Sequence, residues 1–170
     1  QVSENALTGV ALGASMAGMR PVLIHMRTDF MLMSFDQLVN HAAKWKYMSG
    51  GRVNVPVVVR AIIGGGWGSA AQHSQPFQAF FAHVPGLKVV MPSDAHDVKG
   101  LLLGSSADSA PVIFIEHRWL YGIEGAVAQV ERAYDVSGGK GAININVLWE
   151  MGGAQQILEG GLERTKGLVA

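Results

Sequence analysis

The chain has 170 residues, of which 49% are hydrophobic and 15% charged, so folding can bury roughly 70% of the surface that the unfolded chain would expose. This composition excludes a disordered or collagen-like protein. Because 13 lysines and arginines balance 13 aspartates and glutamates, the basic surface that a phosphate backbone requires is absent, and nucleic acid is not an expected partner. The longest apolar runs are far shorter than a bilayer span, so a membrane is not an expected partner either. With no cysteine, the chain has no disulfide, thiolate metal ligand or cysteine nucleophile.

Apolar and small residues recur at helical spacing from Ala6 to Ala17, between a candidate N-cap at Ser3 and a stop at Gly18. Further along the chain, short apolar runs of strand length alternate with helical patterns. In chain order, we expect a helix at 3–18, a strand at 21–26, a helix at 34–47, a strand at 55–60, a helix at 76–83, a strand at 87–91, a helix at 94–107 that Ser93 caps, and a strand at 111–115. Apolar strands separated by helices indicate a parallel sheet that is covered on both faces. The sequence therefore predicts an α/β fold of three layers, with helices on both faces of a mostly parallel sheet.

The regular pattern weakens after Tyr121. Residues 122–141 contain five glycines and have the composition of a connecting segment, while 142–149 and 155–164 predict one more strand and helix. We therefore expect an α/β domain at residues 1–121, and at residues 122–170 a linker followed by the truncated start of a carboxyl-terminal α/β domain. Gln1 lies just before the first helical pattern with no strand in front of it, so we expect the first domain to lack its N-terminal strand and the chain to be a fragment.

Ligands of open parallel sheets bind beyond the carboxyl ends of the strands, where the segments 27–33, 61–75 and 116–121 follow predicted strands. The second segment contains a glycine run at residues 64–71, with one match to the dinucleotide-binding pattern G-x-G-x-x-A. The next helix begins too late for that pattern, and no acidic residue ends a later strand at the distance that a ribose requires. The glycines are better explained by a backbone that passes close to a ligand or to another chain.

Three side chains near these segments each have a structural explanation beside a functional one. Glu4 lies in the first turn of an otherwise apolar helix, where a carboxylate offsets the helix dipole but is also placed to bind a ligand. His73 comes just before the helix that Pro76 begins, and is either a polar loop residue or part of a site. Phe30 follows a strand end, and is either a core residue or a flat surface for a ring. The residues alone leave all three interpretations open.

One side of the second predicted helix is polar. This side is either a solvated stripe or a polar contact with another subunit. Its residues are Asp36, Gln37, Asn40, His41 and Lys44. The large side chains of Trp45, Tyr47 and Met48 near the end of the same helix favour an interface.

A series of ordered motifs runs through the first domain. The motifs are Ser3-Glu4, Ala17-Gly18-Met19-Arg20-Pro21, Asp29-Phe30, residues 36–44, Tyr47-Met48-Ser49-Gly50-Gly51, Gln72-His73-Ser74-Gln75, residues 85–90, Pro92-Ser93, residues 97–102 and residues 111–114. Over residues 2–121 they resemble the beta subunits of the thiamine-diphosphate-dependent decarboxylating component of 2-oxo acid dehydrogenases, of the pyruvate, branched-chain or acetoin type. These proteins belong to the transketolase-like superfamily, and the matching region is their pyrimidine-binding domain.

The resemblance implies roles for four side chains. Glu4 would bond the ring nitrogen of the cofactor's aminopyrimidine and favour the tautomer whose imino nitrogen removes the proton from the thiazolium carbon. Phe30 would stack on the pyrimidine, and Met26 would be a further cofactor contact. His73 would orient the intermediate or give a proton to the lipoyl sulfur, which suits an imidazole near neutral pH.

The resemblance also implies partners and metals. The thiamine diphosphate would be shared with an alpha subunit that holds the diphosphate and magnesium through a G-D-G motif, and no Gly-Asp-Gly occurs in this chain. Two alpha and two beta subunits would form a heterotetramer with a beta–beta contact, which binds a lipoyl acyltransferase core. Some relatives have a structural potassium ion held by backbone carbonyls, and the matching residues here are Val57, Ser105, Asp108 and Ala110. The six histidines lack ligand spacing, so a transition-metal site is not expected.

The implied reaction is decarboxylation of a 2-oxo acid and transfer of the acyl group to a lipoyl carrier, with the chain inactive on its own. Two alternatives stay open: a transketolase-like subunit without a lipoyl step, and a non-catalytic truncated assembly module. The expected compartment is the cytoplasm of a bacterium or the mitochondrial matrix of a eukaryote. The sequence does not decide which 2-oxo acid would be the substrate.

Overall fold

The computed structural model of the chain describes residues 2–66 and 68–127, so the strand expected at 142–149 and the helix expected at 155–164 lie outside the described residues. The α-helices are α1 (Glu4–Met16), α2 (Thr28–Met31), α3 (Ala43–Met48), α4 (Gln78–Ala82) and α5 (Ala95–Ala107). The strands are β1 (Val22–Ile24), β2 (Val58–Ile63), β3 (Lys88–Val90) and β4 (Val112–His117). Short 3-10 helices lie at η1 (Leu32–Ser34), η3 (Ala71–His73) and η4 (Arg118–Gly122), and η2 (Gln37–Ala42) is a π-helix.

The four strands form one parallel sheet in the order β1-β2-β4-β3. The central pair, β2 and β4, is in register from Val58 opposite Val112 to Ile63 opposite His117. Every residue of β4 is buried, as expected for a strand with a neighbour on each side and a layer on each face. The predicted parallel α/β sheet is confirmed.

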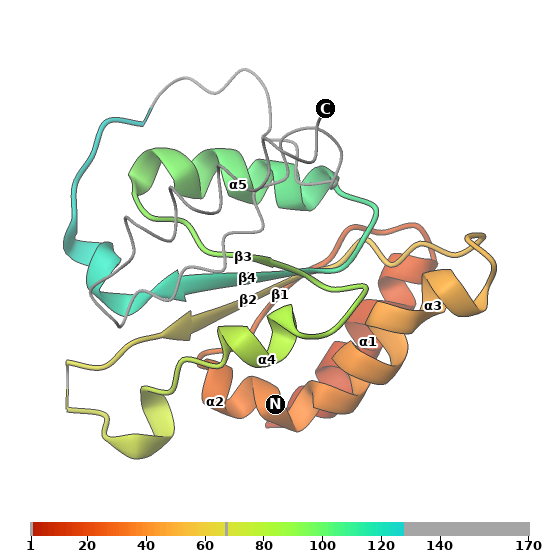
Figure 1. Cartoon of the computed structure of the whole chain (residues 1–170), viewed down its shortest axis with the longest axis horizontal. Coiled ribbons are helices and arrows are strands. Elements are labelled where there is room, and N and C mark those ends of the chain that lie inside the picture. The colour runs from red at the N-terminus through yellow and green to blue at the C-terminus, as the bar shows by residue number, and fades with distance from the viewer. Residues whose placement is uncertain (1, 67, 128–170) are drawn as a thin grey trace.

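Alternate side chains of the strands reach opposite layers. Val59 of β2 packs with Leu12 of α1 in the larger of two apolar clusters, which lies on the side of α1, η2 and α4. Val58 and Phe114 pack with Leu101 of α5 in the second cluster. Figure 1 shows α5 on one side of the sheet and α1, α2, α3 and α4 on the other. The three-layer prediction is therefore confirmed as well.

Some predicted boundaries are wrong. The second strand is not at 55–60 but at Val58–Ile63, because its pairing with β4 sets where the ladder begins and ends. The second helical segment starts at Thr28 rather than at residue 34, so most of the segment 27–33 is helical and not a loop. The helical conformation of this segment lets Met31 pack in the core, where it is fully buried.

The start of α5 also differs from the prediction. Asp94, not Ser93, is the N-cap, and its side chain accepts a hydrogen bond of 2.8 Å from the backbone N–H of Asp97. The hydroxyl of Ser93 instead donates to the carboxylate of Asp97 at 2.7 Å. None of the helices in the described part of the chain is long and apolar enough to cross a membrane.

Gly86 brings the turn between α4 and β3 close to α3. Its φ is +100°, and a Cβ at this position would lie 2.1 Å from the carbonyl oxygen of Ala43. The amino group of Lys44 donates a hydrogen bond of 3.0 Å to the carbonyl of Pro85 in the same turn. Only glycine allows the two backbones to approach this closely.

We therefore expect Gly86→Ala to lower the free energy of unfolding by about 2–5 kcal/mol, the sum of left-handed backbone strain and overpacking against a backbone atom. Urea unfolding of the full chain measures this loss. Gly18→Ala is the matched control, because Gly18 has a similar φ of +98° but no atom within 4 Å of the added Cβ. It should cost only the strain, about 1–2 kcal/mol. Equal losses in the two variants would contradict the close contact.

Candidate functional site

The first turn of α1 is held against the carboxyl end of β1. The hydroxyl of Thr8 donates a hydrogen bond of 2.7 Å to the carbonyl oxygen of Glu4, and it lies 3.1 Å from Nε2 of His25. His25 follows β1 directly, and its backbone N–H donates to the carbonyl of Arg60 at 2.8 Å. Helix α1 also contacts η1, which continues α2. These contacts place Glu4 at the carboxyl end of the parallel strands, which we call the carboxyl edge of the sheet.

The carboxyl group of Glu4 has one oxygen, Oε2, that is buried and has no hydrogen-bond partner among the described residues. Leaving a buried polar atom unpaired costs about 1–3 kcal/mol, so such atoms are found where a ligand or a partner group supplies the missing bond. A helix dipole alone does not require the oxygen to be buried. The burial of Oε2 therefore favours ligand binding over the purely structural explanation of Glu4.

His25 is buried and neutral beside Glu4. Burial lowers the pKa of His25 below its ordinary value of 6.5, and the negative charge of Glu4 raises it in part. The single hydroxyl proton of Thr8 is donated to the carbonyl of Glu4, so Nε2 of His25 must be the donor to Thr8. The neutral ring thus carries its proton on Nε2.

Phe30 and His73 come from distant segments and are in contact. Their ring centroids are 5.1 Å apart at an angle of 80°, which is an edge-to-face pair. Phe30 lies in α2 and His73 ends η3, and both side chains are partly exposed. Met26, also predicted as a cofactor contact, is 76% exposed between the buried residues His25 and Arg27. The structure thus brings Phe30 and His73 together and places Met26 and Glu4 near the end of β1.

The glycine run approaches the chain's own residues. A Cβ on Gly64 would lie 2.7 Å from the ring of His117, and one on Gly66 would lie 2.5 Å from the indole nitrogen of Trp119. That indole nitrogen donates to the carbonyl of Gly65 at 2.9 Å. The run is followed by η3 rather than by an α-helix, so the helix N-terminus that a dinucleotide turn needs is missing.

Several buried polar residues of this edge were missed by the sequence analysis. Arg27 is only 4% exposed, and its guanidinium donates to the carbonyl of Gly64 at 3.0 Å. On the other face of the sheet, Glu116 accepts hydrogen bonds from Arg60 and from the hydroxyl of Tyr121. Burial and this carboxylate raise the pKa of Tyr121 to about 12. Arg27, Arg60 and Glu116 could have been found in the sequence, because each is a charged residue inside or directly after a predicted apolar strand.

The predicted potassium ligands lie at the opposite end of the sheet. The carbonyl of Val57 accepts a hydrogen bond of 2.9 Å from the backbone of Val112, and that of Asp108 accepts one of 2.8 Å from Arg20. Ser105 and Ala110 are the other two predicted ligands, and the potassium site stays a prediction. Within residues 2–66 and 68–127, no group of three or more His, Cys, Asp or Glu residues is arranged to hold a metal ion.

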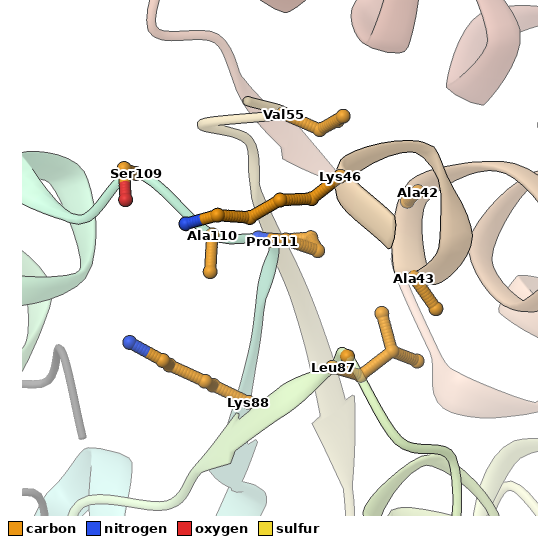
Figure 2. Close-up of a pocket in the computed structure, with 10 residues that line it drawn as sticks. Ala42, Ala43, Lys46, Val55, Leu87, Lys88, Ser109, Ala110 and Pro111 are labelled. Atoms are coloured by element: carbon orange, nitrogen blue, oxygen red, sulfur yellow. The ribbon is translucent and has the colours of Figure 1, made fainter. Parts of the chain in front are cut away.

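A pocket of about 290 Å³ also lies at this amino end of the strands. Figure 2 shows the side chains of Lys46 and Lys88 extending toward the side of the pocket where Ser109 and Ala110 lie. The amino group of Lys88 is bound to the carboxylate of Asp108 at 2.6 Å. Because the pocket borders the first residue of β3 and the segment before β4, it is separate from the edge that holds Glu4 and the contact of Phe30 with His73.

The fold is similar to that of a solved structure. A solved structure described as "Split gene transketolase, inactive beta4 tetramer" superimposes with a TM-score of 0.59 at 22% identity, covering 76% of this chain and 39% of that one. This likeness concerns the fold alone. The parallel sheet and the arrangement of its layers thus define a transketolase-like α/β fold.

Residues 1–124 match the family described as "Transketolase, pyrimidine binding domain", and the chain belongs to this family. It is 51% identical over 142 residues to the acetoin:2,6-dichlorophenolindophenol oxidoreductase subunit beta of Cupriavidus necator, covering 84% of this chain and 41% of that protein. It is 50% identical over 121 residues to the mitochondrial pyruvate dehydrogenase E1 component subunit beta of Caenorhabditis elegans, covering 71% and 34%. The chain thus spans well under half of the length of these relatives. Thiamine diphosphate is the cofactor that the family implies.

We expect Glu4→Gln to lower the pKa of His25 further below 6.5, because it removes the negative charge that opposes the effect of burial. Ring signals of the full chain followed by NMR against pH report this shift, with His25→Asn identifying the signal. Asp97→Asn on the other face of the sheet should leave it unchanged. Unfolding lets His25 take up a proton, so the free energy of unfolding decreases as the pH falls below 6.5. If the pKa of His25 were the same in Glu4→Gln as in the wild type, Glu4 and His25 could not lie close together.

Proposed function

We propose that this chain is the pyrimidine-binding part of the beta subunit of a thiamine-diphosphate-dependent 2-oxo acid dehydrogenase. The whole enzyme would decarboxylate a 2-oxo acid and transfer the acyl group to a lipoyl carrier. The observation that carries the proposal is the unpaired, buried Oε2 of Glu4 at the carboxyl edge of the sheet. The resemblance to pyruvate and acetoin enzyme beta subunits supports it.

The residues at this edge fit the cofactor's pyrimidine. Glu4 would share a proton with a ring nitrogen, which gives its buried oxygen the partner that the chain itself does not provide. Phe30 would offer a flat apolar face for the ring, and the exposed side chain of Met26 would be a further apolar contact. When bound, the cofactor supplies a thiazolium ring that takes up the electron pair left by decarboxylation. His25 would keep the first turn of α1 in place through Thr8 while this proton moves.

His73 would act on the substrate side of the site. Its contact with Phe30 keeps the imidazole next to the surface on which the pyrimidine would lie. From there it would orient the bound substrate carbon or give a proton to the lipoyl sulfur, a role that suits a histidine near neutral pH.

The diphosphate and magnesium would be held by an alpha subunit, because the sequence has no Gly-Asp-Gly motif. We infer a heterotetramer of two alpha and two beta subunits, with a beta–beta contact, that binds a lipoyl acyltransferase core. A potassium ion held by the carbonyls around Val57 and Asp108 would be structural. The compartment would be the cytoplasm of a bacterium or the mitochondrial matrix, in line with bacterial and mitochondrial relatives.

Glu4→Gln should lower the turnover of the assembled enzyme by about 100-fold or more, because an amide cannot exchange a proton with the ring. The rate of acylation of a lipoyl domain by a 2-oxo acid measures this. Asp97→Asn, on the far side of the sheet, is the control and should keep full activity. Unchanged turnover in Glu4→Gln would contradict both catalytic functions and leave the non-catalytic assembly module as the remaining alternative. An enzyme that turns over 2-oxo acid or ketose substrates without acylating the lipoyl domain would be the transketolase-like alternative.

We expect tight binding of thiamine diphosphate only after the alpha subunit is added. The chain offers a pyrimidine contact but no motif for the diphosphate and its metal. Calorimetric titration of the full-length beta subunit with and without the alpha subunit, in the presence of Mg²⁺, compares the two states. Micromolar binding by the beta subunit alone would rule out a shared site.

A further inference from the structure

The segment that carries His73 is tied to the first turn of α2. The hydroxyl of Thr28 donates a hydrogen bond of 2.7 Å to the carbonyl oxygen of Gln75. The side-chain amide of Gln75 donates to Oδ1 of Asp29, also at 2.7 Å, and the backbone N–H of Gln75 lies 3.4 Å from the same oxygen. Three atoms of one residue are therefore held by two consecutive residues, and we call this set of contacts the Gln75 clamp.

The two sides of the clamp differ in how firmly they are held. Thr28 is fully buried, and Met31 in the same helix belongs to the core. On the other side, Ala70 has a φ of 53°, a left-handed conformation that costs a residue with a Cβ about 1–2 kcal/mol. Its neighbours Ala71 and Gln72 are exposed. A strained and exposed segment needs an outside contact to hold one conformation, and the clamp connects it to a core helix.

Asp29 lies in the first turn of α2, although one of its carboxylate oxygens is unpaired there. Its second oxygen, Oδ2, is buried without a hydrogen bond, an arrangement that is unfavourable for the carboxylate itself. The attraction between Asp29 and the nearby guanidinium of Arg27 offsets part of this cost. The carboxylate thus stays where its Oδ1 accepts the hydrogen bond from the side-chain amide of Gln75.

We propose that Thr28 and Asp29 are positioning residues for His73: through the Gln75 clamp they fix the imidazole against Phe30, the next residue of the same helix. Phe30 and the two residues that hold the His73 segment, Thr28 and Asp29, then lie in one turn of α2. The surface for the pyrimidine and the side chain that acts on the substrate therefore keep a constant distance. This inference rests on the proposed function, since it assigns the clamp a purpose in the same reaction.

The test uses the assembled enzyme with four variants: Asp29→Ala, Asp29→Asn, Gln75→Ala and Asp97→Ala. Asp29→Ala removes both contacts to Oδ1, and Gln75→Ala removes the side-chain contact, while Thr28 still donates to the carbonyl of residue 75. Each variant should lower kcat for acylation of a lipoyl domain by about 10–100-fold, the effect of a displaced catalytic group. The affinity for thiamine diphosphate should change by less than about 3-fold, since Glu4 and Phe30 are untouched. Asp29→Asn keeps an oxygen that accepts from Gln75 and should restore activity to within about 3-fold. Asp97→Ala, which removes a carboxylate that accepts a 2.7 Å bond from Ser93 on the far face, should have no effect.

A double-mutant cycle with His73→Ala separates positioning from a general structural role. If Asp29 acts through His73, adding Asp29→Ala to His73→Ala should lower kcat by less than about 2-fold more. The same full loss in both backgrounds would overturn the inference, as would full activity in Gln75→Ala. Should Asp29→Ala fail to assemble, Gln75→Ala decides alone, because Gln75 is exposed and its side chain lies outside the core.

Amide hydrogen exchange gives a readout that does not depend on turnover. Exchange of residues 70–75 in the assembled enzyme should become faster in Asp29→Ala and stay as in the wild type in Asp29→Asn. Unchanged exchange in Asp29→Ala would overturn the clamp. The outcome is distinguishable from failure of the proposed function: an active Glu4→Gln enzyme contradicts the reaction, while an inactive Glu4→Gln with a fully active Asp29→Ala contradicts the clamp only.

Discussion

The parallel pairing of β2 with β4 is the constraint on which the rest of the structure depends. Because β4 is buried throughout and β2 is buried at four of its six residues, their register cannot shift without moving apolar side chains out of the two core clusters. This register fixes where the chain leaves the sheet. It brings Gly64, after β2, against His117 at the end of β4, and β1 delivers His25 and Arg27 to the same edge. A site made from segments far apart in the sequence follows from strand pairing alone.

The polar groups of this edge are mostly paired with one another, which makes the unpaired ones informative. Arg60, Glu116 and Tyr121 satisfy each other on one face of the sheet, and Thr8 links His25 to the backbone of Glu4 on the other. In the described part of the chain, three buried side-chain oxygens have no partner: Glu4 Oε2, Asp29 Oδ2 and Gln78 Oε1. One of these belongs to Asp29, whose neighbour Phe30 contacts the ring of His73. Buried polar atoms of this kind occur where a bound molecule can supply the missing hydrogen bond.

The layers of the fold could be predicted from the sequence because continuous apolar strands and intervening helical periods are local signals. Glu4, Phe30 and His73 could be named from motif order, and the contact of Phe30 with His73 agrees with a common site. The start of β2 and the helical state of residues 28–31 could not be read, since both depend on packing against partners elsewhere in the chain. The clamp at Gln75 joins residues 46 or 47 positions apart, and such hydrogen bonds leave no periodicity in the sequence.

The close approach of Gly86 to Ala43 has a consequence for how variants of this protein would behave in a cell. Both residues line the amino-end pocket, far from the edge that holds Glu4 and His73. A bulkier side chain at that turn would act on the amino end of the sheet and not on the residues around Glu4 and His73. It would instead produce a temperature-sensitive phenotype, in which the abundance of the folded protein falls on warming.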